Sequence, residues 1–330
     1  MKTALVTGGG GFLGGAIVRQ LRTEGVRIRS LSRSKYDWLD DFGVESFIGD
    51  LANRDDVMRA VDGVDIVYHV AAKAGVWGAR QAYEDVNVLG TSNVLHACQT
   101  FAVRHLVYTS TPSVVHAGAD IAGADESLPY PTHFETHYPE TKARAEQMVL
   151  DANSEDLRTV ALRPHLIWGP GDNHLLPRII DRARRGRLRL VGPPFPLVDS
   201  TYIVDAARAH LLAARELAGA GRCAGRAYFI SQGEPWPTDK LINGLLEASG
   251  EASCERLVGP RTALLIGAFL EFIYRFFRIQ HEPPMTRFVA KQLSTAHWYN
   301  IDAAKRDFGY EPTYSIDTAL GELQDHRPGA

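Results

Sequence analysis

A glycine-rich turn close to the N-terminus constrains the fold more than any other feature of this chain. The apolar run Thr3–Thr7 suits a buried strand, and the glycines of TGGGGFLG follow it directly before a helical pattern begins. In such a turn one glycine permits the sharp bend, a second lets the backbone approach a pyrophosphate, and a third lets the helix pack closely on the strand. The N–H groups at the start of the helix then face the phosphates. The motif predicts a dinucleotide site formed by Gly8, Gly11, Phe12, Leu13 and Gly14.

Apolar runs alternate with helical patterns through the first half of the chain. This alternation is typical of strand–helix–strand units that build a parallel sheet. The predicted fold class is α/β, a doubly wound parallel sheet of the Rossmann type that binds ligands at the carboxyl ends of its strands. We expect strands at Thr3–Thr7, Arg27–Leu31, Ser46–Ile48, Asp65–His69, His105–Thr109 and Thr159–Arg163, and helices near Phe12–Arg22, Asp55–Val61, Ala82–Thr100 and Lys142–Ala152.

The pattern changes after Arg163. Prolines and glycines crowd residues 164–171 and 192–196, and short helical patterns follow them. We therefore expect residues 1–163 to form the dinucleotide-binding domain, including the helix that begins near Lys142. Residues 164–330 should form mainly a smaller substrate-binding lobe that is not an independent domain.

The end of the second expected strand bears on the choice of cofactor. Enzymes that bind NAD usually carry Asp or Glu there for the ribose hydroxyl, whereas this chain has Ser32 and Arg33. A guanidinium matches the oxygens of a 2′-phosphate, so the sequence favours NADP(H), with NAD(H) as the alternative and Lys35 as a further cation. After the third strand, Asp50 and Leu51 are expected at the adenine. A helix N-cap is the alternative role for Asp50.

The motif YPETK carries the chemistry expected of this chain. Tyr138 and Lys142 are four residues apart, so they share one face of a helix. A lysine ammonium beside a phenol lowers the pKa of the phenol by favouring the phenolate. Such a tyrosine can give a proton to an alkoxide or take one from an alcohol near neutral pH. The pair predicts a hydride-transfer enzyme that acts on a carbonyl or an alcohol.

Composition and charge weigh against several other classes of function. The formal net charge of −3 argues against a nucleic-acid partner, and the arginines of residues 178–189 are expected to form a solvated face. The three cysteines are scattered, which suits a reducing cytoplasm and predicts no zinc site. His133 and His137 are four apart but are expected in a loop without a third ligand. The opening MKTALVT has too short an apolar run for a signal peptide.

The chain resembles the extended short-chain dehydrogenase/reductases over nearly its whole length. The resemblance implies the Rossmann fold, a nicotinamide dinucleotide and catalysis by Tyr138 and Lys142. It rests on segments that follow one another in the family's order: TGGGGFLG, IGDL at Ile48–Leu51, YHVAAKAG at Tyr68–Gly75, VNVLGTSNVL at Val86–Leu95, VYTSTPSVV at Val107–Val115, YPETK, RPHLIWGPGD at Arg163–Asp172 and the C-terminal WYNIDAAKRDFGYEP.

The resemblance assigns further residues to the site. It implies that Thr111 binds the substrate oxygen, with Ser110 and Ser113 as alternatives, and that Ala71 borders the cofactor. Asn87 matches a position linked to the family's network of active-site water and backbone. A turn or cap asparagine is the other reading of Asn87.

Within this family the sequence is similar to the 3β-hydroxysteroid and sterol-carboxylate dehydrogenase branch. AAKAGVWG at Ala71–Gly78 and EPPMTRFVAKQL at Glu282–Leu293 are similar to bacterial 2-alkyl-3-oxoalkanoate reductases of long-chain olefin biosynthesis. This resemblance implies reduction of a long-chain β-keto acid to a β-hydroxy acid, with steroid or sterol-4-carboxylate oxidation as the alternative. A non-catalytic dinucleotide sensor would tend to lose the tyrosine or the lysine. The family also implies a homodimer through the helices Ala82–Thr100 and Lys142–Ala152.

The segment Thr262–Ile279 (TALLIGAFLEFIYRFFRI) is almost wholly apolar. Glu271, Arg275 and Arg278 interrupt it at spacings that place them on one narrow stripe of a helix. Three charges in its second half argue against a membrane span. We expect either a core helix or an apolar wall over the active site for a long alkyl substrate, with contact to a membrane surface or a partner enzyme as a further role.

Overall fold

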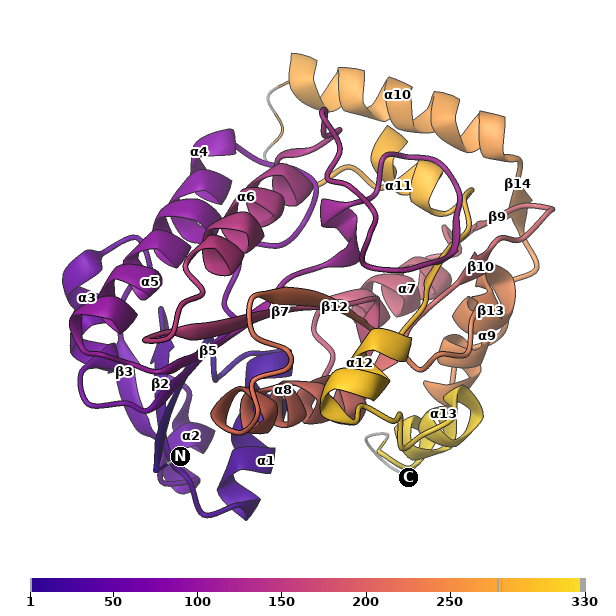
Figure 1. Ribbon diagram of the computed structural model, residues 1–330. Coiled ribbons are helices and arrows are strands. Elements are labelled where there is room, and N and C mark those ends of the chain that lie inside the picture. Colours follow the sequence, from indigo (N-terminus) through magenta and orange to yellow (C-terminus); the bar gives the residue numbers. More distant parts are fainter. Residues whose placement is uncertain (1, 278, 280, 327–330) are drawn as a thin grey trace.

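The computed structural model describes residues 2–277, 279 and 281–326. A seven-stranded parallel sheet forms its centre, in the order β12-β7-β5-β4-β1-β2-β3 (Figure 1). From β1 the chain adds β2 and β3 on one side and then β4 and β5 on the other. The direction in which strands are added therefore reverses between β1 and β4, where ligands of such sheets bind. The strands are β1 (Thr3–Thr7), β2 (Arg27–Ser32), β3 (Glu45–Ile48), β4 (Ile66–His69), β5 (His105–Thr109), β7 (Arg158–Pro164) and β12 (Arg226–Ile230). The predicted doubly wound Rossmann fold is confirmed.

The seventh strand is a correction to the sequence prediction, which gave six. β12 pairs with β7 along five residues and is reached through the long helix α8 (Ile203–Ala218). Part of the chain after residue 163 therefore completes the sheet. The short run RAYFI carried a strand signal, but it lies in a stretch that was assigned mainly to the substrate lobe.

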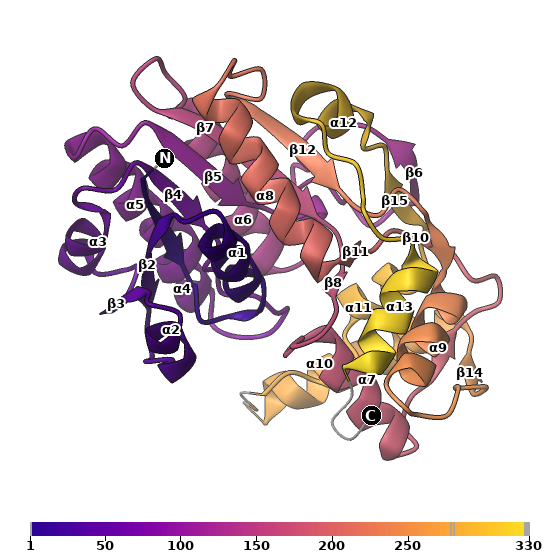
Figure 2. The ribbon, with the colours of Figure 1, turned by 90° about the horizontal axis from the view of Figure 1, so that it is seen from below.

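Helices cover both faces of the sheet. One face carries α3 (Arg54–Val61), α5 (Gly90–Thr100) and α6 (His137–Asp151), and the other carries α1 (Phe12–Thr23) and α8 (Figures 1 and 2). The short α2 (Asp37–Asp41) lies in the connection between β2 and β3. The central strands are buried because helices cover both faces; β1 is buried at all five residues, whereas the edge strand β3 is mostly exposed.

The expected helix Ala82–Thr100 is divided in the structure. It consists of α4 (Arg80–Tyr83), a π-helical turn η1 (Glu84–Leu89) and α5. A π turn holds one residue more than an α turn and is common at functional sites. Here it contains Asn87, which is buried against α6.

The remaining elements form a smaller lobe beside the carboxyl ends of the strands (Figure 2). One buried apolar cluster extends from α1 and α8 through Leu241 and Leu245 to Leu323, so the lobe and the sheet share a core. The lobe contains a four-stranded sheet (β13 Trp236–Pro237, β10 Leu197–Val198, β15 His297–Tyr299, β6 Ile121–Ala124) and two strand pairs (β8 Ile167–Trp168 with β11 Thr201–Tyr202; β9 Leu190–Val191 with β14 Leu257–Val258). Its helices are α7 (Leu175–Arg184), α9 (Thr238–Ala248), α10 (Pro260–Phe276), α11 (Arg287–Gln292), α12 (Asp302–Phe308) and α13 (Ile316–Asp325).

The helix α10 occupies most of the apolar segment, but its orientation differs from both expectations. Its aromatic side chains Phe269, Phe272 and Phe276 face outward, so it is not a core helix and they do not wall a cavity. Glu271, from the charged stripe, is buried on the inner face. Arg278 lies outside the described residues. Within the described chain, no helix is long and apolar enough to span a bilayer.

Candidate active site

A cleft of 490 Å³ lies at the carboxyl ends of the central strands. The main residues that the sequence predicted for cofactor binding and catalysis line it, whereas Lys35 and Ser113, named as an additional and an alternative residue, do not. The predicted lining residues are Gly8, Gly11, Phe12, Leu13, Gly14, Ser32, Arg33, Asp50, Leu51, Ala71, Thr111, Tyr138 and Lys142. The fold brings them together because each follows a parallel strand or lies on a helix beside one.

The glycine-rich turn forms a close backbone cradle at one end of the cleft. A Cβ atom on Gly14 would lie 2.2 Å from the Gly8 carbonyl oxygen, and one on Gly10 would lie 2.1 Å from the ring of Tyr36. Gly8 has φ of +70°, which L-residues with side chains rarely adopt. No side chain caps α1, whose N-cap is Gly11. The turn thus fits a pyrophosphate held by backbone N–H groups.

The end of β2 presents a cation to the cleft. Arg33 is exposed, and its guanidinium has no hydrogen bond or ion pair within the described residues. Lys35 is engaged elsewhere, because its ammonium lies 3.0 Å from Asp40 and 3.3 Å from Asp37. These carboxylates raise the pKa of Lys35. Arg33, rather than Lys35, is therefore the cation available to a ligand at this position.

Asp50 and Leu51 lie on the same side of the cleft as Arg33. Asp50 Oδ1 accepts the backbone N–H of Ala52 at 2.9 Å, which leaves the carboxylate at the rim. The N-cap of α3 is Asn53, which accepts the N–H groups of the first turn. The alternative reading of Asp50 as a helix N-cap is wrong.

Tyr138 lines the cleft from the first turn of α6. Burial raises the pKa of Tyr138 to about 12, and a hydrogen bond with Thr111 acts in the opposite direction. The sequence suggested a pKa lowered by the lysine, whereas burial raises it in the structure.

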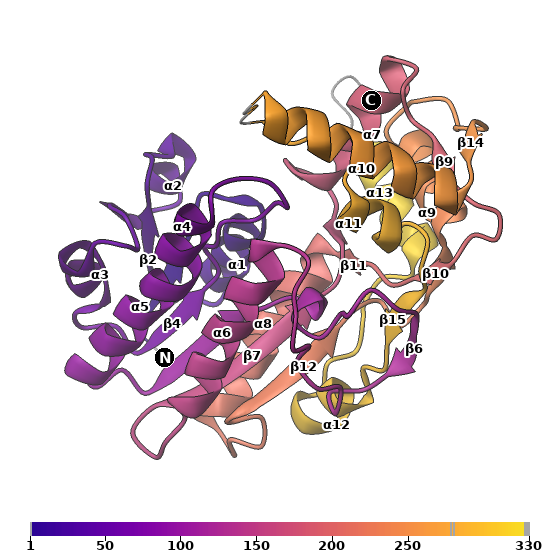
Figure 3. The ribbon, with the colours of Figure 1, turned by 90° about the horizontal axis from the view of Figure 1, so that it is seen from above.

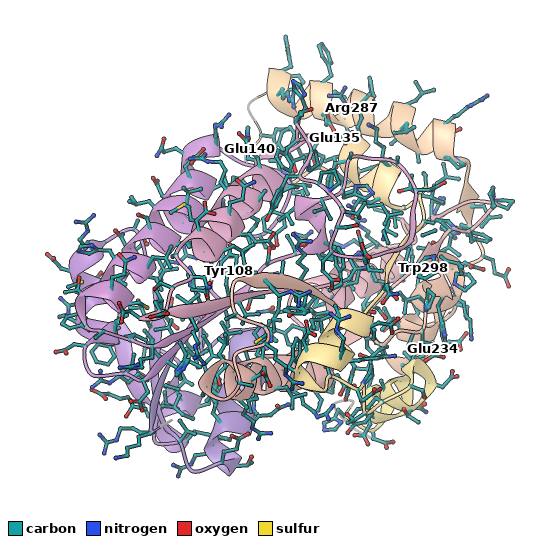
Figure 4. All side chains as sticks on the ribbon, in the orientation of Figure 1. Tyr108, Glu135, Glu140, Glu234, Arg287 and Trp298 are labelled. Carbon is teal, nitrogen blue, oxygen red and sulfur yellow. The ribbon has the colours of Figure 1, made fainter. Side chains whose placement is uncertain are left out.

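Lys142 is buried one helical turn further along α6, with 2% of its surface exposed. Its ammonium donates to the backbone carbonyl of Thr109 at 2.6 Å and lies 4.1 Å from the ring centre of Tyr108. Burial lowers the pKa of Lys142 to about 7, although Glu146 partly offsets this effect. The amine thus titrates near neutral pH. Figure 4 shows Tyr108 at the centre of the molecule.

Thr111 is the hydroxyl residue beside Tyr138. Its Oγ1 donates to Ser113 Oγ at 3.2 Å and accepts the Ser113 N–H, so Ser113 holds Thr111 in place. Ser110 also lines the cleft, and its hydroxyl is buried without a hydrogen bond in the described structure. Ser113 does not line the cleft. Thr111 is therefore the residue best placed to bind a substrate oxygen together with Tyr138.

A buried chain of hydrogen bonds connects the glycine-rich turn with the π turn. The Thr91 hydroxyl donates to the Asn87 carbonyl at 2.6 Å, so it accepts from His69 Nε2 at 3.0 Å. His69 Nδ1 then accepts from Thr7 Oγ1 at 2.9 Å, and this hydroxyl also accepts two backbone N–H groups after β4. Burial lowers the pKa of His69 to about 3, so the ring is neutral as this pattern requires.

Asn87 extends this series of hydrogen bonds to α6, the helix that carries Tyr138. Its Nδ2 donates to Thr141 Oγ1 at 3.0 Å and to the Lys73 carbonyl at 3.1 Å, and its Oδ1 accepts the Lys73 N–H at 2.8 Å. Thr141 lies between Tyr138 and Lys142 in α6. Asn87 thus joins α6 to the loop after β4 and is neither a turn nor a cap residue. The π turn that aims it inward left no signal in the spacing of the sequence.

A second cavity of 420 Å³ was not predicted. It lies between the first turn of α6, α10 and α11, and its lining includes His137, Glu271, Arg275 and Thr286. Figure 4 shows Glu135 and Arg287, which also line it, between α6 and α10. The cavity adjoins the turn that carries Tyr138, so it is a candidate substrate compartment.

The histidines expected before the catalytic helix are placed differently from the prediction. His137 is the first residue of α6, whereas His133 precedes it in a loop as expected. Among the described residues, no group of three His, Cys, Asp or Glu side chains is arranged to hold a metal ion.

Comparison with known proteins gives the relationships of the chain. A family model described as the 3-beta hydroxysteroid dehydrogenase/isomerase family matches residues 5–258. The chain is 51% identical over 323 residues to a Stenotrophomonas maltophilia protein named 2-alkyl-3-oxoalkanoate reductase, covering 97% of this chain and 98% of that one. It is 34% identical to a 3-beta-hydroxysteroid dehydrogenase of Mycolicibacterium neoaurum, covering 96% and 89% of the two chains.

A solved structure shares the fold across the whole chain. The UDP-glucose 4-epimerase of Thermus thermophilus, in complex with NAD, has a TM-score of 0.72 at 24% identity and covers 99% of each chain. The relatives with higher identity are named reductases and dehydrogenases. The chain therefore belongs to the 3-beta hydroxysteroid dehydrogenase/isomerase family and is an NAD(P)-dependent oxidoreductase that acts on CH–OH and C=O groups.

Proposed function

We propose that this enzyme uses NADPH to reduce the C3 carbonyl of a 2-alkyl-3-oxoalkanoate to the corresponding β-hydroxy acid. The main support is the 51% identity, over nearly the full length of both chains, to a protein named for that reaction. The lining of one cleft by Tyr138, Lys142 and Thr111 adds chemical support, because these are the groups that a carbonyl reduction needs.

Tyr138 is the proton donor in the proposed mechanism. Burial keeps its pKa at about 12, so the phenol is protonated at neutral pH. That form can transfer a proton to the oxygen as negative charge develops on it. Thr111 turns its hydroxyl from Ser113 Oγ to the same oxygen, donates a hydrogen bond to it and orients it. The bound dinucleotide supplies the hydride.

Lys142 restores the proton on Tyr138. Its pKa of about 7 means that charged and neutral forms are both populated near neutral pH, so its ammonium can give up a proton and regain one from solvent. The carbonyl of Thr109 fixes the position of the ammonium. The overall reaction consumes one NADPH and one proton for each ketone that is reduced to an alcohol.

The preference for NADP(H) over NAD(H) is part of the proposal. Arg33 provides an unpaired guanidinium at the end of β2, within the part of the chain that the structure describes, and the neighbouring Ser32 leaves no carboxylate there to bind a ribose 2′-hydroxyl. A 2′-phosphate satisfies the guanidinium.

A homodimer is also part of the proposal. α5 and α6 lie side by side on the face of the sheet that also carries α3. Leu89, in the adjoining π turn, is an exposed apolar residue. Pairing of this face with its copy would cover Leu89. Light scattering at micromolar concentration should give the dimer mass, and a monomer at every concentration would remove this part of the proposal.

The proposed reaction is tested with the purified enzyme, both cofactors and a panel of substrates. The panel contains 2-alkyl-3-oxoalkanoates, unbranched β-keto acids, 3β-hydroxysteroids and a sterol 4-carboxylate, with the products identified by mass spectrometry. We expect the 2-alkyl-3-oxoalkanoates to turn over fastest, with NADPH. Faster oxidation of the steroids would establish the alternative activity. Binding of NADPH without turnover of any substrate would indicate a dinucleotide sensor.

A further inference from the structure

The outer face of α10 is the most apolar part of the molecular surface. The described chain has eleven exposed large hydrophobic side chains, and six of them lie between residues 265 and 277. They are Leu265, Ile266, Phe269, Phe272, Phe276 and Phe277, and together they are called here the α10 apolar face. Leu265, Phe269, Phe272 and Phe276 are spaced by four, three and four residues, so they form one stripe along the helix. Their exposed fractions are 72%, 63%, 66% and 70%.

Specific contacts hold this face outward. A Cβ atom on Gly267 would lie 2.7 Å from the backbone of Thr286, so α10 packs backbone to backbone against the start of α11. The Glu271 carboxylate accepts the Arg287 N–H at 2.7 Å and its Nε–H at 2.9 Å. These contacts bury Gly267 and Glu271 on the inner side of α10. A rotation that buried the phenylalanines would remove them and expose Glu271.

An ordinary surface helix buries its large apolar side chains, whereas α10 exposes them. Figure 1 shows α10 along the outer edge of the lobe with α11 beneath it, and Figure 3, seen from above, shows α10 in the foreground with no described element in front of it. An apolar ridge of this size on a monomer marks a surface that another structure covers.

The charges around the α10 apolar face are mainly positive. Between residues 255 and 277 the exposed charged side chains are Glu255, Arg256, Arg261 and Arg275, and the second acidic residue in this range, Glu271, is buried. Arg275 also lines the cavity beneath the helix, so Arg256 and Arg261 are the cations at the margin of the outer face. The strand pair β9–β14 brings residues 184–189 beside the N-terminal end of α10. Four of these residues are exposed arginines; Arg184 and Arg185 pair with Glu251 and Asp181, and Arg187 and Arg189 make no ion pair within the described residues. This excess stands out because the whole chain has a net charge of −3.

We propose that α10 docks on the surface of an anionic lipid bilayer and lies in the plane of the interface. Aromatic and aliphatic side chains on one face of a helix with arginines at its margins are the features of an interfacial helix. At 17 residues the helix is about 25 Å long. The arginines would contact lipid phosphates while the phenylalanines enter the acyl boundary. An exposed apolar face with mainly positive charge at its margins matches a broad negative surface.

The docked helix would also place the substrate cavity at the membrane. Glu271 and Arg275 line the 420 Å³ cavity that adjoins the first turn of α6. A long-chain substrate dissolved in the bilayer could then enter beneath α10 and reach Tyr138. This delivery role rests on the proposed reductase function, whereas the docking rests on the surface alone.

Vesicle sedimentation of the full chain tests the docking. One set of vesicles contains equal parts of phosphatidylglycerol and phosphatidylcholine, and the other contains phosphatidylcholine only. We expect the enzyme to sediment with the anionic vesicles, more weakly at high salt, and little with the neutral ones. Phe272→Ser combined with Phe276→Ser should weaken the binding by about 100-fold, because two exposed rings lose their burial in lipid.

Matched variants separate the contributions of apolar contact and charge. Leu197→Ser removes an exposed hydrophobic side chain elsewhere on the lobe and should leave vesicle binding unchanged. Arg256→Gln combined with Arg261→Gln should abolish the preference for phosphatidylglycerol. All of these side chains are exposed, so circular dichroism should show folded variants.

Two results would overturn the docking proposal. One is wild-type protein that sediments with neither vesicle, or a Phe272→Ser/Phe276→Ser variant that binds as the wild type does. The other is self-association in light scattering that the same variant abolishes, since the face would then join two protein chains. Turnover of a long-chain keto acid in vesicles and of a short one in water is measured separately. Vesicle binding without turnover of either would contradict the reductase function and leave the docking intact.

Discussion

Replacement of Arg33 with alanine should change the cofactor preference of the enzyme without changing its stability. The Arg33 side chain is exposed and makes no hydrogen bond or ion pair with the rest of the described chain, so its removal leaves no buried group unsatisfied. A hydrogen bond to a charged group contributes roughly 1.5–3 kcal/mol. Loss of the contact with the 2′-phosphate should therefore raise the Kd for NADPH by about 13- to 160-fold. The Kd for NADH, which has no 2′-phosphate, should stay the same.

Titration calorimetry with each cofactor measures this change, and Lys35→Ala is the matched control. Lys35 is two residues away and has the same charge, but Asp37 and Asp40 already hold its ammonium. The Lys35 variant should therefore keep the wild-type ratio of the two Kd values. An equal loss of affinity for both cofactors in Arg33→Ala, or an equal effect in the Lys35 variant, would show that Arg33 does not select the 2′-phosphate.

Three further predictions concern the site and the core. Thr111→Ala should lower kcat by about 10- to 100-fold with NADPH affinity unchanged, whereas Ser113→Ala should reduce kcat much less; similar losses in steady-state assays would disprove the assignment. Glu146→Ala leaves the guanidinium of Arg163, which is 3% exposed, without its carboxylate, and should lower the free energy of unfolding by about 3–5 kcal/mol in urea titrations. Burial lowers the pKa of His210 to about 4, below its unfolded value of 6.5, so its contribution to stability is complete above 6.5 and is lost as pH falls towards 4. The free energy of unfolding of the wild type should fall between about pH 7 and pH 5 by about 2 kcal/mol more than that of His210→Gln, and parallel pH curves would contradict this assignment.

Most of the sheet could be predicted because its central strands are buried on both faces. Such strands are short apolar runs, and four helical patterns lie between the predicted strands. No helix was predicted between β2 and β3, where the structure has the short α2. β12 was missed because the prolines and glycines after Arg163 indicated a lobe built from insertions. The cleft could be predicted residue by residue because parallel strands end on one side, so positions after β1, β2, β4 and β5 must meet there.

Other features depend on contacts that sequence spacing does not encode. The sequence pattern of α10 indicates an apolar and a polar face but does not say which of them packs against the rest of the protein. That is decided by the contacts of Gly267 and Glu271 with the start of α11. The environment of Lys142 is set by a backbone carbonyl of β5 and by burial. For the same reason the sequence suggested a depressed pKa for Tyr138, whereas the structure gives a raised one.

The central claim is that Tyr138 donates the proton in a carbonyl reduction within this cleft. The most direct measurement is a single turnover of a 2-alkyl-3-oxoalkanoate by enzyme saturated with NADPH, comparing the wild type with Tyr138→Phe. The substitution keeps the ring and removes the transferable proton, so the rate should fall by about 100- to 10,000-fold while the Kd for NADPH stays unchanged. A phenylalanine variant that reduces the keto acid at close to the wild-type rate would contradict the mechanism.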